Sequence, residues 1–329
     1  MEKGTDRNLS PFKNDLGEPI ANSSHAKIFR YGEIESGKSF IIKEGETNYT
    51  PPLLKCLQKF VALNRETVSG FLVKYLGPEF NIQPDFDFVK NGVAEYFLMR
   101  KYFHCDASGR NGDSESRRKL LAELADKRGT LHEQMRKILG DEDTVEILTS
   151  IVRKHQDENF LPEEFGVVIG HPHNLDERQA AERQAKEEKL PETYYIIQEG
   201  IGGKNVKPLS ESTDEELRKH PELLEKLVTF AVLTKKMYLD TGKLIDLRPE
   251  EVLRNPFEYF QKTANVLVDV GSNGDAENVY FVDTRWLWDK NSKIGGGGIN
   301  LIQHLGIASI DRAIKKYFDL SKSAGSGKV

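Results

Sequence analysis

Apolar and polar residues alternate over 26–31, and the run 39–43 either alternates or is buried throughout. Alternation places every second side chain on the same face of a strand, so we predict a strand in each of these stretches. The short apolar run 194–198 also has the character of a strand. Two shorter strands are predicted at 265–269 and 279–283, on either side of a Gly-Ser-Asn-Gly turn.

Other segments repeat their apolar residues every three or four positions, which is typical of helices. The predicted helical segments are 51–75, parts of 105–190, 221–239 and 301–320. Thr213 and Glu216 have the spacing of a capping box, which marks a further helix start. The run 86–103 is predicted as a β-hairpin, because Asn91-Gly92 favours a tight turn between two apolar stretches.

The order of these elements predicts an α+β protein in two lobes with a helical insertion. The expected division is a flexible arm, an N-terminal lobe, a charged helical insertion, a last strand with a hinge, a helical C-terminal lobe and a flexible tail. The corresponding ranges are 1–18, 19–104, 105–190, 191–203, 204–320 and 321–329.

The composition restricts the class of protein. The 329 residues carry a net charge of −5, and no apolar run approaches the roughly 18 residues of a membrane span. The first 18 residues are polar and contain no apolar signal core. Two cysteines, Cys56 and Cys105, are too few for a disulfide framework. We therefore expect a cytoplasmic globular protein that binds neither nucleic acid nor membrane.

One phosphate-binding pattern is complete. Residues 32–39 match G-x-x-x-x-G-K-[ST] at every fixed position. A P-loop leads directly into a helix whose N-terminus points at the phosphates. Here Lys38 is followed by a predicted strand, then Gly45 and two prolines, and Glu33 and Glu35 would face the anion. A P-loop NTPase is therefore the less favoured interpretation.

The favoured interpretation rests on separated motifs in a fixed order. They are a strand ending in Lys43, a helix with Glu66, a strand leading into a glycine-bearing connector, the Asp246 segment, and two short strands bounded by Asn265 and Asp283. This succession resembles the protein-kinase-like superfamily, which includes small-molecule phosphotransferases of the aminoglycoside and choline type. The resemblance covers 20–290 apart from 105–190, and it implies a bilobal protein-kinase-like fold.

The resemblance implies a role for each motif. Lys43 would contact the nucleotide phosphates and Glu66 would orient it, because phosphoryl transfer depends on positioning and charge neutralisation. Asn265 and Asp283 would supply the hard oxygen ligands that Mg²⁺ requires. Asp246 would orient the acceptor hydroxyl as the catalytic residue.

The nucleotide itself would lie between a turn and a connector. The turn, 22–25, includes Ser23 and Ser24 and lacks the family's glycines, which allow close approach of the backbone to phosphate. The connector after the third strand includes Glu199 and Ile201. The implied cofactors are Mg²⁺ and ATP.

The spacing of the motifs departs from the family pattern. Asp246 and Asn265 lie 19 positions apart, farther than in the family. An insertion of about one short helix over 250–260 would reconcile them. Under strict spacing, Glu251 would replace the asparagine or Phe260 would replace the aspartate.

The flanking residues depart as well. Leu244-Ile245 precede Asp246 in place of His and Arg, and Thr284-Arg285 follow Asp283 in place of Phe-Gly. Only 46 residues remain after Asp283, too few for the substrate-docking helices of protein kinases. Two functions stay open: an ATP-dependent phosphotransferase with a small-molecule hydroxyl acceptor, or an inactive pseudokinase-like module that binds a protein partner through 105–190.

Overall fold

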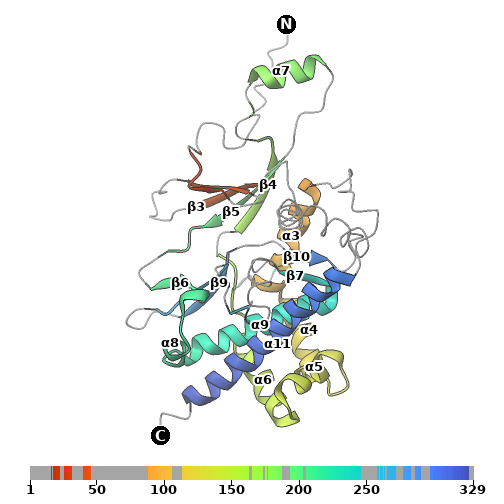
Figure 1. The fold of residues 1–329 in the computed structure, drawn as a ribbon, viewed down its shortest axis with the longest axis vertical. Helices are drawn as coiled ribbons and strands as arrows, with labels where there is room; N and C mark the ends of the chain where they lie inside the picture. Colours follow the sequence, from red (N-terminus) through yellow and green to blue (C-terminus); the bar gives the residue numbers. More distant parts are fainter. Residues whose placement is uncertain are drawn as a thin grey trace, which may run out of the picture. The chain divides into compact units, whose positions relative to one another are not determined.

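The computed structural model shows a mixed α+β chain with antiparallel sheets (Figure 1). It forms two compact units. The first comprises Met1–Arg65, Ile82–Tyr96 and Pro162–Gly200, and the second comprises Glu66–Asn81, Phe97–Leu161 and Ile201–Val329. The structure describes residues 16, 18–22, 26–31, 40–45, 88–105, 113–162, 165–172, 175, 177–186, 193–202, 205–245, 258, 260–261, 263, 265–271, 277–282, 286–289 and 297–325.

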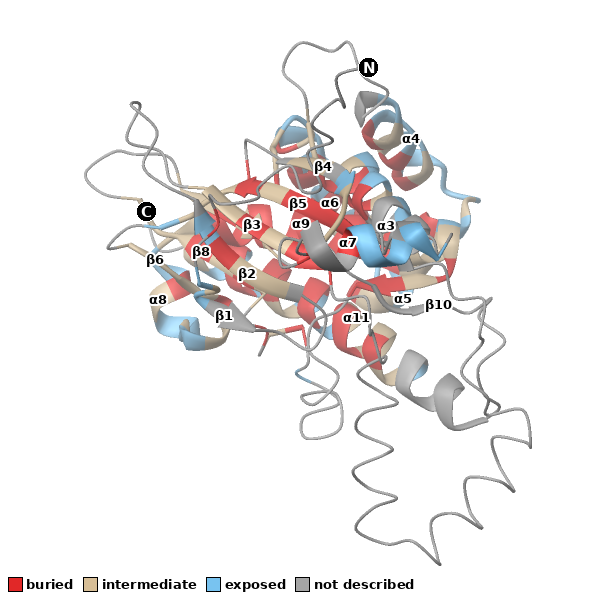
Figure 2. Cartoon of the chain, turned by 90° about the horizontal axis from the view of Figure 1, so that it is seen from above, coloured by how far each residue is buried: buried red, intermediate tan, exposed pale blue. Residues whose placement is uncertain are grey.

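The first unit contains a five-stranded antiparallel sheet with the order β1-β2-β3-β5-β4. Its strands are β1 (Ala21–Asn22), β2 (Ala26–Tyr31), β3 (Phe40–Gly45), β4 (Phe165–Gly170) and β5 (Thr193–Glu199). The three strands predicted at 26–31, 39–43 and 194–198 are confirmed as β2, β3 and β5, which are neighbours in this sheet. The strand β5 is buried over most of its length (Figure 2).

One face of this sheet packs on an apolar cluster. Phe29, Ile42 and Ile197 face each other across β2, β3 and β5, and the buried residues Leu16 and Tyr195 join them. Side chains alternate between the faces of a strand, so Lys43 projects from the opposite face. The alternation in the sequence therefore determines the side on which Lys43 lies.

Residues 88–103, predicted as part of a hairpin, form the helix α3 (Phe88–Phe103) instead. Tyr96, Met99 and Phe103 are each at most 3% exposed and recur every three or four positions, as residues on one helix face do. The hairpin prediction gave too much weight to Asn91-Gly92, because buried positions with a helical period override a local turn preference.

The span 105–190 contributes to both units. The helices α4 (Asp113–Ala125), α5 (Thr130–Leu139) and α6 (Glu142–Lys154) pack against one another in the second unit, which confirms helical character there. The strand β4 was not predicted; it pairs with β5 in the first unit and is followed by α7 (Glu177–Ala185). Glycines bound the short apolar run of β4, which suits a strand and is too short for a buried helix.

The second unit is built around the long helix α9 (Pro221–Thr241), whose residues from Leu223 onward are almost all buried. Its first residue is Pro221, and Gly242 ends it in the left-handed conformation with φ 71°. The helix α11 (Gly297–Gly325) packs along α9. Both helices were predicted, as was the Thr213–Glu216 capping box that begins α8 (Asp214–Arg218).

None of the described helices is long and apolar enough to cross a membrane.

Two small antiparallel sheets complete the second unit. One has the order β6-β8-β9 and the other pairs β10 with β7. The strands are β6 (Val206–Pro208), β7 (Lys243–Ile245), β8 (Val266–Asp269), β9 (Asn278–Phe281) and β10 (Trp286–Asp289). The strands β8 and β9 confirm the predicted pair, whereas β7 and β10 were not predicted. The predicted helix 51–75 lies outside the described residues.

Five phenylalanine rings form the centre of the second unit. The Phe230 ring of α9 lies 5.1 to 5.8 Å, between ring centroids, from those of Phe103, Phe160, Phe260 and Phe281. The backbone also links these segments: Phe160 N donates to Phe103 O and Phe281 N donates to Phe160 O. The strand β9 is thus held on a packed aromatic core.

Candidate functional site

Lys43 lies on β3, the third strand of the sheet, between Ile28 of β2 and Ile196 of β5. It is half-buried and makes an interaction within the protein. A lysine on a central strand has its backbone fixed by ladders on both sides, so its side chain starts from a well-defined position. The position on a central strand is the one that the predicted phosphate-contacting role requires.

Side-chain hydrogen bonds fix the register of β3 and β5 next to Lys43. The buried Thr193 hydroxyl donates to Gly45 O at 2.6 Å, and the Tyr195 hydroxyl lies 3.0 Å from Oε1 of the buried Glu44. A shift of one residue would turn Lys43 to the other face of the sheet. These contacts therefore maintain the orientation of the lysine.

Of the predicted turn, the structure describes only Asn22, which ends β1 and pairs with Lys27 of β2. Ser23 and Ser24 lie outside the described residues. Glu199 ends β5 opposite Phe40, and Ile201 follows it half-buried. Glu66 lies outside the described residues.

In the second unit, Asn265 lies at one end of the β8–β9 pair. Val266 faces Phe281, and one step further Val282 N donates to Asn265 O at 2.9 Å. Asn265 N in turn donates to the buried Thr263 hydroxyl at 3.0 Å. The start of β8 and the end of β9 are thus joined directly, and the next residue along the chain is Asp283.

The two unpredicted strands, β7 and β10, pair with each other in the second unit. Ile245, the last residue of β7, pairs with Trp286, the first residue of β10. Four residue steps separate Val282 from Trp286, which limits the distance between their Cα atoms to about 14 Å. The helix α9 packs against both β7 and β9. Asn265 is thus joined to Val282, and Ile245 to Trp286, within the second unit.

Asp246 and Asp283, the predicted catalytic residue and metal ligand, lie outside the described residues. They follow Ile245 and Val282 directly in the sequence. Among the residues that the structure describes, no group of three or more His, Cys, Asp or Glu side chains could hold a metal ion. An asparagine oxygen and carboxylates from these two segments are the hard ligands that Mg²⁺ prefers.

A polar network anchors the end of α9, just before β7. The Asp240 carboxylate accepts hydrogen bonds from the Tyr102 hydroxyl, at 2.6 Å, and from the buried Lys236. Burial alone would raise the pKa of Asp240, but these two hydrogen bonds outweigh it and hold the pKa below its usual value. Burial and the bond to Asp240 raise the pKa of Tyr102. Asp240 is therefore ionised and structural at neutral pH.

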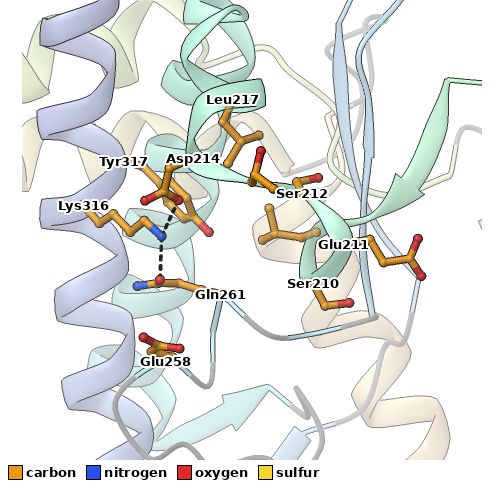
Figure 3. Close-up of a pocket in the computed structure, with 11 residues that line it drawn as sticks. Ser210, Glu211, Ser212, Asp214, Leu217, Glu258, Gln261, Lys316 and Tyr317 are labelled. Carbon is orange, nitrogen blue, oxygen red and sulfur yellow. Dashed lines mark hydrogen bonds and ion pairs between the residues drawn. The ribbon is translucent and has the colours of Figure 1, made fainter.

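The second unit also contains a polar pocket of about 350 Å³ (Figure 3). It lies beside the 3₁₀ turn η1 (Leu209–Glu211), and Lys316 bridges Asp214 at 2.6 Å and Gln261 at 2.9 Å on its wall. Ser210 N donates to Thr263 O, two residues before Asn265. The described residues that line this pocket include none of the predicted site residues.

The sequence interpretation overlooked Gln198. Its side chain is 3% exposed, and it occupies β5 opposite Ile41, on the same sheet face as Lys43. The available signal in the sequence was that Gln198 is a polar residue that directly follows the apolar run Tyr194–Ile197 and directly precedes the predicted connector.

Neither a scan against protein-family models nor searches of curated proteins and solved structures gives a match to this chain. The function of this chain is therefore inferred from its residues and from their positions within each unit.

Proposed function

We propose that this chain is a kinase-like protein that binds Mg²⁺ and ATP and transfers the γ-phosphoryl group to a small-molecule hydroxyl acceptor. The supporting observation is the hydrogen bond from Val282 N to Asn265 O, which joins the start of β8 to the end of β9. The kinase resemblance gives the metal-binding role to Asn265 and to Asp283, the residue that follows Val282.

The chemistry of each proposed residue follows from its type. Asn265 and Asp283 hold Mg²⁺, which neutralises the charge that develops on the phosphoryl group. Asp246 accepts a hydrogen bond from the acceptor hydroxyl and aligns its oxygen for in-line attack. Lys43, on the third strand of the other unit, contacts the nucleotide phosphates and is oriented by Glu66.

The structure around residues 32–39 favours this proposal over a P-loop. The strand β3 begins at Phe40, directly after Ser39, and runs to Gly45. A P-loop requires a helix at this point, because the amides of its first turn bind the phosphates. Lys43 is therefore the better candidate for the phosphate-contacting lysine than Lys38.

A comparison of these two lysines tests the proposal. Mg-ATP should raise the melting temperature of the parent, because a ligand that binds only the folded state stabilises it by mass action. We expect Lys43→Ala to lose most of this shift, and Lys38→Ala to keep it. The opposite pattern would support the P-loop, and the absence of any shift in the parent would reject nucleotide binding.

A second candidate function is a nucleotide-binding module without catalysis. The observation that favours it is that Leu244 and Ile245, which replace the family's His and Arg before Asp246, are both completely buried. Neither side chain can therefore assist at the reaction centre. Phosphorylation of a panel of hydroxyl acceptors by the parent but not by Asp246→Asn would establish catalysis, whereas binding without turnover would support the module.

A further inference from the structure

The polar pocket of the second unit has features of a ligand site that the proposed function does not use. Its volume of about 350 Å³ is within the range of small-molecule sites. Three parts of the unit line it: the η1–α8 segment over 209–217, the residues 258 and 261, and the residues 316 and 317 of α11. A ligand held here would therefore be bound by the second unit alone.

Tyr317 brings a buried hydroxyl without a partner to this pocket. The residue is 1% exposed and lines the pocket beside Asp214 (Figure 3). Burial and the charge of Asp214 raise the pKa of the hydroxyl, and no hydrogen bond contributes to this shift. Within the described part of the chain the hydroxyl thus has no hydrogen-bond partner. Such a group is costly, and native proteins rarely keep one unless something else supplies the bond.

The groups around Tyr317 combine donors and acceptors with their charges already matched. Lys316 Nζ lies 2.6 Å from Asp214 Oδ1 and donates to Gln261 Oε1 at 2.9 Å. The carboxylate therefore neutralises the ammonium group. The second oxygen of Asp214 can still accept a hydrogen bond, and the amide nitrogen of Gln261 can donate one. This wall suits a neutral ligand that donates and accepts at closely spaced positions.

Charged occupants fit the pocket less well. Its other two carboxylates, Glu211 and Glu258, are exposed, so water and salt screen them and they attract a cation only weakly. A bound anion would still meet three carboxylates against the one ammonium group of Lys316. A metal ion has no ligand set here, because the described residues include no group of three or more His, Cys, Asp or Glu side chains that could hold one.

The pocket is set apart from the strand that precedes the predicted catalytic residue. On α11, Gly306 lies directly against the Leu244 side chain of β7, with no room for a Cβ atom between them. Tyr317 follows Gly306 by eleven residues on the same helix, which corresponds to about 16 Å along its axis. A ligand beside Tyr317 is therefore held apart from β7, after which Asp246 follows in the sequence.

We propose that this pocket binds a small neutral polyhydroxylated molecule of the sugar class, as a ligand distinct from the phosphoryl acceptor. Each hydroxyl of such a molecule donates one hydrogen bond and accepts others, so neighbouring hydroxyls can satisfy Tyr317, Asp214 and Gln261 together. The binding requires neither ATP nor Mg²⁺, so this proposal does not rest on the proposed function.

Calorimetric titration of the full chain without nucleotide tests the proposal. The probes are glucose, galactose, mannose, ribose and myo-inositol, with 1,4-diaminobutane and inorganic phosphate as charged comparisons. We expect a neutral probe to bind the parent, and Tyr317→Phe, which removes only the hydroxyl, to weaken that binding at least about fivefold. Gln261→Met should weaken it as well. Tyr238→Phe removes a hydroxyl from α9 outside the lining of the pocket and should bind as the parent does.

Several results would overturn this proposal. They are binding of none of the neutral probes, equal binding by the parent and Tyr317→Phe, or tighter binding of either charged compound. Phosphorylation of the bound probe by the parent with Mg-ATP, lost in Tyr317→Phe, would make the pocket the acceptor site and contradict the separation from β7. The melting temperature of Tyr317→Phe without ligand verifies that the variant is folded. Failure of the parent to bind Mg-ATP would reject the proposed function and leave the titrations with neutral probes unaffected.

Discussion

Phe230 shows at the scale of a single residue how the core of the second unit is packed. Its ring contacts four other phenylalanine rings, one of which belongs to β9. We expect Phe230→Ala to lower the free energy of unfolding by about 3–5 kcal/mol, because it leaves a cavity in a packed core. Phe97→Ala is the control: Phe97 is 58% exposed, so the change should be within about 0.5 kcal/mol. Equal losses in denaturant titrations of the two variants would contradict the aromatic core.

Residue types and their order were sufficient to predict Lys43 and Asn265 as site residues, because charged or amide residues at the ends of apolar strands are easily recognised in a sequence. The burial of Gln198 and its place on the same sheet face as Lys43 could not be predicted in the same way. Both depend on the register of the sheet, which only the folded chain shows. The same holds for the Asp240 network, since Tyr102 reaches it from 138 positions away.

Among the elements, α5 is tied to its two neighbours by His132. Its Nδ1 lies 2.5 Å from Leu124 O of α4, and its Nε2 lies 3.1 Å from Glu142 of α6. Burial alone would lower the pKa of His132, but these two hydrogen bonds outweigh it and raise the pKa. Both ring nitrogens donate when the imidazole is protonated, so the charged form links the three helices.

This linkage predicts a pH dependence with a definite sign. Because the folded-state pKa of His132 is raised, its stabilisation is complete below the unfolded value of about 6.5 and is lost as the pH rises through the folded value. The free energy of unfolding should therefore decrease above pH 6.5 in the parent and decrease less in His132→Gln. His304→Gln, at an exposed position of α11, should keep the parent's slope. Identical slopes in denaturant titrations of parent and His132→Gln would exclude the linkage.

Elements with a long, regular pattern could be predicted, and short ones could not. The helix α9 repeats its apolar residues over 21 residues, whereas β7 has only three residues and depends on pairing with β10 more than 40 positions later. The error at α3 arose because a two-residue turn signal was weighted above the spacing of Tyr96, Met99 and Phe103. The strand β4 was missed because it lies between helices and pairs with β5, which follows it by more than 20 positions.

For the whole molecule, the α+β class followed from the order of local patterns, because each pattern reports one element. The division of 105–190 between the two units did not, because it depends on contacts between distant segments. At this scale the central proposal is that Lys43 and Asn265 bind the same Mg-ATP.

A crystal structure with Mg²⁺ and a non-hydrolysable ATP analogue tests that claim most directly. We predict that the β- and γ-phosphates contact Lys43, that one Mg²⁺ is held by Asn265 and Asp283, and that the Asp246 carboxylate faces the γ-phosphate. Phosphates bound by residues 32–39, or a metal ion that touches neither Asn265 nor Asp283, would contradict the account.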